Sequence, residues 1–363
     1  MGFLKKMYKK IYEIKNLLNS FKAVMSDNSE NIPIVRYYFD LEGNLFDLQK
    51  KLITNNFYTK PYKRFIVSDP KRREISAPHF EDRIVQHAIV NIIEPIFEKT
   101  FIEDAYACRV KKGTHFALKR LKKFLQSTRS FYGKNKNIFV LKCDIKKFFA
   151  SISWNILIEI LSKKIKDKET MSLLEKIITS YTVYGKNTKD NAYQENLFDV
   201  NWSIPVSVSK RRGLPIGNLT SQLFANIYLN ELDQFVKRVL RERWYGRYMD
   251  DFFVISGDKK HLEKIKNKIN TFLENKLKLT LHPKKSFIQN VKYGVCFVGY
   301  RIFFDHVLVR GSTLRRFQKK YRKKLKKVLG GLLEEKKLEA CKQSFRGHLK
   351  HANTYWLDKK MFG

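Results

Sequence analysis

The chain alternates between segments whose apolar residues recur at helical spacing and short apolar runs. Apolar positions three and four apart mark one face of a helix, whereas short runs bounded by turn residues are typical of buried strands. Helices are predicted over 3–25, 83–99, 113–128, 154–166, 259–276 and 312–333, with another beginning after Asn218. Strands are predicted as a hairpin over 60–78 with a basic turn, over 138–144, as a hairpin over 244–256, and over 279–288 and 293–304.

The order of these elements indicates the fold class. Between about 138 and 290 it reads β–α–loop–α–β–β–α–β, which resembles a split βαβ arrangement, an antiparallel sheet backed by helices. The polar, turn-rich stretch 183–210 is expected to be a surface loop or β insertion. We therefore predict an α+β fold in which strand 138–144 and hairpin 244–256 share one sheet.

Acidic residues end one predicted strand and form the tip of a hairpin. Asp144 ends strand 138–144, and Asp250 and Asp251 lie at the tip of hairpin 244–256. Adjacent carboxylates repel unless a cation is present, and successive side chains of a strand point to opposite faces. Hard carboxylate oxygens without a nearby His or Cys suit Mg²⁺. The pattern predicts a two-metal nucleotidyl-transfer site, the alternative being that Asp250 and Asp251 form a simple polar turn.

The net charge of the chain indicates the kind of partner that it binds. Lys and Arg number 73 against 35 Asp and Glu, a formal net charge of +38, and the basic residues are spread over the whole chain. An excess of this size repels itself unless a polyanion neutralises it, which favours a nucleic-acid partner over a surface that is cationic for solubility alone. The amphipathic basic segment 3–25 either packs on its own domain or lies on a membrane, and the first is the expectation.

The cysteines and the apolar runs exclude several other classes. Four widely separated cysteines with no CxxC pair predict neither a disulfide framework nor a zinc site, and fit a reducing cytoplasm. No apolar run reaches the length of a membrane span, and the first residues lack the pattern of a signal peptide. We expect a cytoplasmic protein without a membrane partner.

The tetrapeptide Tyr248-Met249-Asp250-Asp251 resembles the signature of reverse transcriptases, and the resemblance extends over roughly residues 36–310. It implies a right-hand polymerase fold and RNA-directed DNA polymerase activity on an RNA template, an RNA/cDNA duplex and dNTPs. Further family motifs occur in the family's order: fingers motifs in Arg73–Pro78 and Asp82–Gln86, the first catalytic motif in Asp144–Phe149, a template- and nucleotide-contacting motif in Gly213–Gln222, the next in Leu281–Lys285, and the primer grip in Phe297–Tyr300.

The resemblance also implies a division of the chain. It places an N-terminal basic helix in 1–35, the fingers in 36–137, the palm in 138–310 with the insertion 183–210, and a helical, basic thumb in 311–363. It carries ligation of two Mg²⁺ ions, with Mn²⁺ as a substitute ion, to Asp144 and Asp250, with Asp251 nearby and the Ile145 carbonyl as a further ligand.

The resemblance assigns roles to other side chains as well. Phe149 falls at the steric-gate position, where a bulky ring under the sugar selects against a 2′-hydroxyl, the alternative being a core aromatic beside Phe148. The predicted nucleotide contacts are Arg64, Lys71, Arg73, Ile216, Gln222 and Lys285, and the predicted primer grip is Phe297, Val298, Gly299 and Tyr300. For each of the first three the alternative is a solvated basic turn, and Lys285 matches the proton donor to pyrophosphate only loosely.

One motif narrows the family resemblance. Retron and group II intron enzymes usually carry Gln-Gly and Ser-Pro in the 213–222 segment, where this chain has Ile216-Gly217 and Ser221-Gln222. With Tyr106–Arg109 and Lys112–His115, this departure resembles the reverse transcriptases of diversity-generating retroelements. Those enzymes copy a template-repeat RNA with errors at adenines and work with a small basic accessory protein that assembles as a ring.

Ile216 suggests a physical reason for such errors. A Gln there could hydrogen-bond the nucleotide and the template base, whereas Ile has no polar atom in its side chain. The hypothesis is that mispairing opposite adenine becomes tolerable, and the alternative is a neutral packing substitution. Two other functions remain open: a retron or phage-defence reverse transcriptase, and a non-catalytic RNA-binding scaffold.

Overall fold

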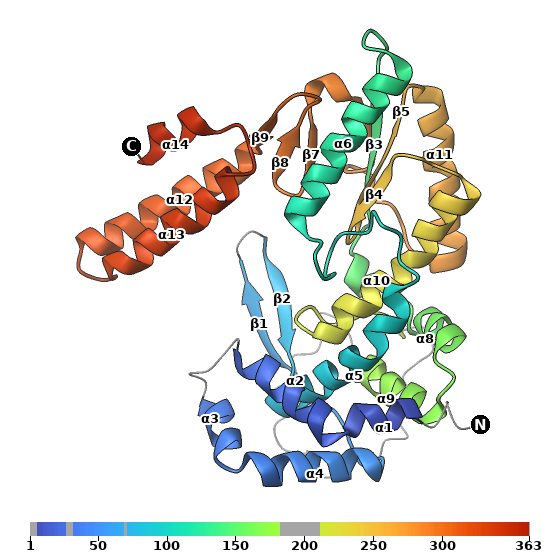
Figure 1. The fold of residues 1–363 in the computed structure, drawn as a ribbon, viewed down its shortest axis with the longest axis vertical. Coiled ribbons are helices and arrows are strands. Elements are labelled where there is room, and N and C mark those ends of the chain that lie inside the picture. The colour runs from blue at the N-terminus through green and yellow to red at the C-terminus, as the bar shows by residue number, and fades with distance from the viewer. Residues whose placement is uncertain (1–5, 27–31, 69–70, 182–210, 363) are drawn as a thin grey trace, which may run out of the picture. The chain divides into compact units, whose positions relative to one another are not determined.

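The computed structural model describes residues 6–26, 32–68, 71–181 and 211–362, and these form two compact units (Figure 1). The first unit comprises 1–101, 146–232 and 272–280, and the second comprises 102–145, 233–271 and 281–363. The predicted insertion 183–210 lies outside the described residues, as does the Asp69-Pro70 part of the basic turn.

The first unit is mainly helical. Its helices are α1 (Lys6–Tyr12), α2 (Ile14–Ser26), α3 (Ile32–Phe39), α4 (Leu41–Ile53), α5 (Phe80–Glu98), α7 (Phe148–Ser151), α8 (Trp154–Lys164), α9 (Lys168–Thr179) and most of α10 (Leu219–Gln234).

The single helix predicted over 3–25 is wrong, because the chain breaks between α1 and α2. The Asn16 amide donates hydrogen bonds to the carbonyls of Lys10, Ile11 and Ala88 and so competes with helix continuation. Leu17, Phe21 and Val24 of α2 are buried, and α2 packs against α5. The amphipathic segment thus packs on its own unit.

A two-stranded hairpin completes the first unit. Strands β1 (Lys63–Val67) and β2 (Arg73–Ala77) pair antiparallel, as predicted for 60–78. Most of their side chains are exposed, but Ser76 is buried and its N–H donates to the Ile216 carbonyl at 2.9 Å. The hairpin is therefore tied to the segment just before α10.

The second unit is built on a four-stranded antiparallel sheet of order β4-β5-β3-β6. Its strands are β3 (Phe139–Asp144), β4 (Tyr245–Tyr248), β5 (Asp251–Ser256) and β6 (Phe287–Asn290). Strand β3 lies in the middle, and its register with β5 runs from Phe139 opposite Ser256 to Asp144 opposite Asp251. The predicted antiparallel sheet that joins 138–144 with 244–256 is confirmed.

The strand predicted over 279–288 begins only at Phe287. Leu281 makes a single bridge with Ile145, and the N–H groups of Lys285 and Ser286 both donate to the His282 carbonyl in a turn. Pro283 has no N–H to offer to a strand ladder, which is why a turn forms here.

The strand predicted over 293–304 is two strands, β7 (Val295–Phe297) and β8 (Tyr300–Ile302), which with β9 (Val307–Val309) form a three-stranded sheet.

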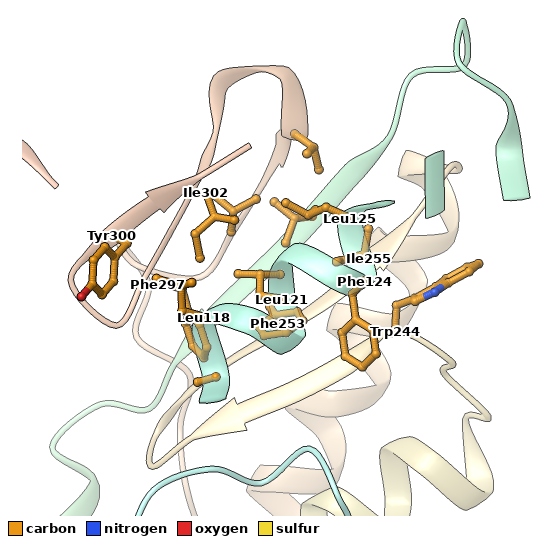
Figure 2. Packing of buried hydrophobic residues seen from close by; sticks show 14 of the residues in the cluster. Leu118, Leu121, Phe124, Leu125, Trp244, Phe253, Ile255, Phe297, Tyr300 and Ile302 are labelled. Atoms are coloured by element: carbon orange, nitrogen blue, oxygen red, sulfur yellow. The ribbon is translucent and has the colours of Figure 1, made fainter. Parts of the chain in front are cut away.

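Helix α6 (Thr114–Tyr132) supplies one side of the core of the second unit, shown in Figure 2. Leu118, Leu121 and Leu125 of α6 pack on Phe253 and Ile255 of β5 and on residues of the three-stranded sheet. Burial of a side chain of this size contributes about 1.5–3 kcal/mol, so the apolar stripe of α6 fixes which face of the helix is left outside. Helix α11 (Lys259–Phe272) lies on the other side of the strands in Figure 1.

The chain ends in three helices, α12 (Gly311–Leu329), α13 (Glu335–Leu349) and α14 (Tyr355–Phe362). Phe317 of α12 stacks on Phe345 of α13 with ring centroids 3.7 Å apart, and the outer face of α12 is rich in Lys and Arg. The predicted tail helix ends four residues earlier than expected, because Gly331 takes a positive φ of 69° that terminates α12. None of the described helices is long and apolar enough to span a membrane.

Candidate active site

The register between β3 and β5 brings two of the predicted carboxylates side by side. Asp144, the last residue of β3, is the cross-strand partner of Asp251, the first residue of β5. The Lys285 ammonium donates to both Asp144 oxygens at 2.8 and 3.0 Å. The His282 N–H donates to the Asp144 carbonyl at 2.7 Å. The turn that replaces the predicted strand thus positions Lys285 on Asp144.

Asp251 is held by Lys142, a residue that is not among those predicted from the sequence. Lys142, two residues before Asp144 on β3, donates to Asp251 Oδ2 at 3.1 Å. Asp251 Oδ1 is buried and has no hydrogen-bond partner in the described part of the chain. Burial raises the pKa of Asp251 to about 6, Lys142 opposes the rise, and Asp144 and Asp250 add to it. A signal was available: residues two apart on a strand share a face, so Lys142 belongs beside Asp144.

The turn between β4 and β5 carries Asp250, and the side chain of Arg247 stabilises it. Met249 has a φ of 54°, a left-handed conformation that costs a non-glycine residue about 1–3 kcal/mol. Arg247 Nη1 donates to the Met249 carbonyl at 3.1 Å. Backbone strain at this turn is thus offset by a hydrogen bond from a charged side chain.

Arg247 is in turn fixed by Asp233, and neither residue is among those predicted from the sequence. Arg247 Nε and Nη2 donate to Asp233 Oδ1 and Oδ2 at 2.8 and 2.6 Å, and the Tyr245 hydroxyl donates to Oδ1 at 2.6 Å. The side chains of Arg247 and Asp233 are 1% and 0% exposed. The sequence places an Arg directly before the Tyr248 tetrapeptide, but its buried partner, fourteen residues earlier, is apparent only in the fold.

The donor set of this site suits a hard divalent cation. Carboxylate oxygens from β3 and β5 are adjacent, and the unpartnered Asp251 Oδ1 is an oxygen that a cation would satisfy. Among the described residues, no three His, Cys, Asp or Glu side chains already gather as a metal-binding group. The four-member ligand set of Asp144, Ile145, Asp250 and Asp251 therefore stays a prediction; Ile145 is buried and pairs with Leu281.

The predicted primer grip forms the tight connection between β7 and β8. Val298 and Gly299 have positive φ values of 43° and 92°, so this turn needs the conformational freedom of glycine at its second position. Phe297 packs edge-on against Phe253 at 5.1 Å, in the core. The Tyr300 hydroxyl donates to the His348 carbonyl at 3.0 Å, which ties the segment to α13. Its role in gripping a primer stays a prediction.

The other predicted contacts lie in the first unit. Arg64, Lys71 and Arg73 are exposed on the β1–β2 hairpin and its turn, with Arg64 3.8 Å from Glu74. Their exposed side chains are accessible to a triphosphate, and their role in binding it stays a prediction. Gln222 is exposed in the first turn of α10.

Phe149 and Ile216 differ from ordinary core residues. Phe148 is buried and Phe149, whose ring meets it edge-on at 5.4 Å, is half-buried. Ile216 is also half-buried, and its carbonyl accepts from Ser76. A Cβ added at Gly217 would come within 3.0 Å of the Ser76 carbonyl, so the backbone passes close to β2 at this point.

Comparison with known proteins identifies the family. The model of the family described as "Reverse transcriptase (RNA-dependent DNA polymerase)" matches residues 61–302, more than half of the chain. Protein YkfC of Escherichia coli K12 is 28% identical over 289 residues, which cover 70% of each chain. The group II intron-encoded protein LtrA of Lactococcus lactis is 25% identical over 85% of this chain, which spans about half (55%) of LtrA.

A solved structure supports the fold alone. Apo telomerase from Candida tropicalis aligns over 76% of this chain and 55% of its own length, with a TM-score of 0.51 and 13% identity. The expected α+β, right-hand polymerase fold with antiparallel sheets is confirmed. Together with the matched family model and the paired carboxylates of β3 and β5, it leads to one conclusion. The chain belongs to the reverse transcriptase family of RNA-dependent DNA polymerases.

Proposed function

We propose that this chain extends a primer along an RNA template by two-cation nucleotidyl transfer at the β3–β5 site. The observation that carries the proposal is the pairing of Asp144 with Asp251, which places two carboxylates side by side at the same end of the two inner strands of the sheet. Reverse transcriptases generally use divalent metal ions, and we assign Mg²⁺ to the oxygens of Asp144, Asp250 and Asp251 with the Ile145 carbonyl. Two such ions would stabilise charge on the attacking and leaving oxygens.

The chain's own residues prepare this site. Lys142 neutralises part of the charge of Asp251, and Lys285 does the same for Asp144, so the carboxylates stay together before a cation arrives. Arg247 holds the turn that carries Asp250. In the same proposal, 36–137 are fingers, 138–310 palm and 311–363 thumb, the basic helix 1–35 precedes them, and Phe149 selects against the 2′-hydroxyl.

A primer-extension assay tests the general activity. The purified chain should add dTMP to an oligo(dT) primer on a poly(rA) template with Mg²⁺, and Mn²⁺ should substitute. The length of the product, measured on a denaturing gel, reports the activity. Binding of the primed template without any extension under either ion would refute the proposal and favour an RNA-binding scaffold.

We further propose that the chain is the polymerase of a diversity-generating retroelement and copies a template-repeat RNA with errors at adenines. The support is Ile216, an apolar, half-buried residue that follows Pro215 in the nucleotide-contacting motif. Its expected partner is a small basic protein that assembles as a ring. A retron or phage-defence enzyme is the competing proposal; it would need neither that protein nor a template repeat for full activity.

Ile216→Gln is expected to lower misincorporation opposite template adenines by roughly tenfold. A regained polar contact worth about 1–3 kcal/mol would again penalise the mismatched pair. Sequencing of cDNA made on a defined RNA template measures the error at each base. Ile216→Val, which keeps an apolar side chain, is the matched control and should leave the errors unchanged; an unchanged spectrum in Ile216→Gln would show that the substitution is a matter of packing.

A further inference from the structure

A basic groove lies between α6 and the segment that follows α13. It has a volume of about 620 Å³, and its charged lining consists of Lys119, Lys122 and Lys123 of α6 together with Lys350. His351 and Asn353 add polar groups, and no acidic side chain lines the groove. Within the part of the chain that the structure describes, none of the four lysines forms an ion pair.

The fold imposes this concentration of charge on α6. Leu118, Leu121, Phe124 and Leu125 are buried in the core (Figure 2). Lys119 and Lys123 are exposed and Lys122 is half-buried, so the three lysines gather on the side of α6 that the core leaves uncovered. Helical residues three and four apart lie about 5–6 Å from each other, close enough for like charges to repel. The acidic neighbour Asp104 does not relieve this repulsion, because both of its oxygens already accept from Arg120. A ligand that brings negative charge would be stabilised here.

The groove also has an aromatic element. The rings of His351 and His115 stack with centroids 3.6 Å apart. Burial, together with His115 and Lys119, lowers the pKa of His351, which favours the neutral ring; the imidazole offers a flat face and a hydrogen-bonding edge. Lysines beside a flat ring suit RNA, whose phosphates and bases both find partners, better than they suit an acidic peptide.

A second basic groove lies at the other end of α6. It has a volume of about 330 Å³ and is lined by Arg129, Lys134, Lys136 and Lys292, with Asp305, which pairs with His306, as its acidic member. Gln126 links the two grooves: it lines the first, and its amide donates to the carbonyl of Phe304, which lines the second. The part of α6 that lines the two grooves runs from Leu118 to Arg129, a rise of roughly 16 Å, enough for several phosphates of one strand.

We propose that the outer face of α6, with its two grooves, binds the phosphate backbone of a folded RNA. None of the lining residues belongs to the β3–β5 carboxylate site or to the primer grip. The surface would therefore hold an RNA stem as a separate contact, while template and primer engage the catalytic residues. This inference does not depend on the proposed RNA copying, since it concerns binding alone.

The test removes three charges from the first groove in the full chain. Lys119→Gln/Lys122→Gln/Lys123→Gln is expected to raise the Kd for a fluorescent RNA stem-loop by about ten- to a hundredfold at about 0.15 M salt. The slope of the logarithm of the binding constant against the logarithm of the salt concentration is negative, and its magnitude should decrease by about one for each lost lysine. Extension of saturating oligo(dT)–poly(rA) should be unchanged.

The matched control makes the same change of charge on another helix of the same unit. Lys260→Gln/Lys264→Gln/Lys268→Gln on α11 replaces three exposed lysines and should leave the Kd within about twofold of the unchanged chain. An equal loss in both triple variants, or no loss in the α6 variant, would overturn the inference. So would binding of polyglutamate that the α6 substitutions abolish while RNA binding is retained, which would indicate an acidic protein partner.

The outcomes separate this inference from the proposed function. A chain that fails to extend any primer, but loses stem-loop binding in the α6 variant alone, refutes the polymerase proposal and supports the RNA surface. A chain that extends primers normally and keeps stem-loop binding in the α6 variant supports the polymerase proposal and refutes the RNA surface. Circular dichroism of all variants confirms that the substitutions leave the fold intact.

Discussion

Asp144→Asn is expected to lower the rate of DNA synthesis on an RNA template by at least about 10³-fold. An amide in place of the carboxylate binds a divalent cation more weakly. The cation contributes several kcal/mol of transition-state stabilisation, and each 1.36 kcal/mol lost lowers the rate tenfold. The same loss is expected for Asp250→Asn. Single-turnover primer extension measures both.

The fold should survive these changes. Lys285, the partner of Asp144, is 44% exposed, so their ion pair contributes about 1 kcal/mol or less. Glu263→Gln on α11, an acid-to-amide change in an exposed ion pair with Lys259, is the control and should keep full activity. An Asp250→Asn chain that retained every cellular activity would instead establish a non-catalytic RNA-binding role.

Arg247→Met is expected to destabilise the second unit by about 3–5 kcal/mol, because it leaves the Asp233 carboxylate buried without its bidentate partner. Replacing both members should recover most of that loss, since buried ion pairs are often exchanged for apolar residues at little cost. Urea denaturation of Arg247→Met and of Arg247→Met/Asp233→Leu measures the two effects.

Activity then distinguishes support of the fold from positioning of the turn. The double variant still lacks the donor to the Met249 carbonyl, so its kcat should remain about 10²-fold low with little change in the KM for dNTP. Asp104 and Arg120 offer a matched pair in the same unit, where the Tyr106 hydroxyl also donates to the aspartate. Arg120→Met/Asp104→Leu keeps the Arg247 side chain, and with it the donor to the Met249 carbonyl, and should keep a normal kcat. A double variant of Arg247 with full kcat would show that the arginine serves stability alone.

The elements that the sequence predicted well are those with a strong periodic pattern and a local end signal. Helix α6 begins one residue after its predicted start and ends four residues after its predicted end, and hairpin β4–β5 occurs close to its predicted bounds, since apolar stripes and alternation reflect burial directly. The residues 279–286 were wrongly predicted as strand, because an apolar pair such as Leu279 and Leu281 is also compatible with a buried turn. The break between α1 and α2 depends on Asn16, whose amide reaches the Ala88 carbonyl of α5, a contact that no local pattern contains.

By itself, the sequence determined the chemistry of this protein: carboxylates on two strands, a large excess of positive charge and the order of family motifs. Those features depend only on the types of side chain and on their spacing along the sequence. The tertiary structure alone decided which aspartate lies beside Asp144, which lysines hold the carboxylates and which buried pair braces the turn. Strand register, long-range ion pairs and burial arise from packing between distant segments, so they exist only once the chain has folded.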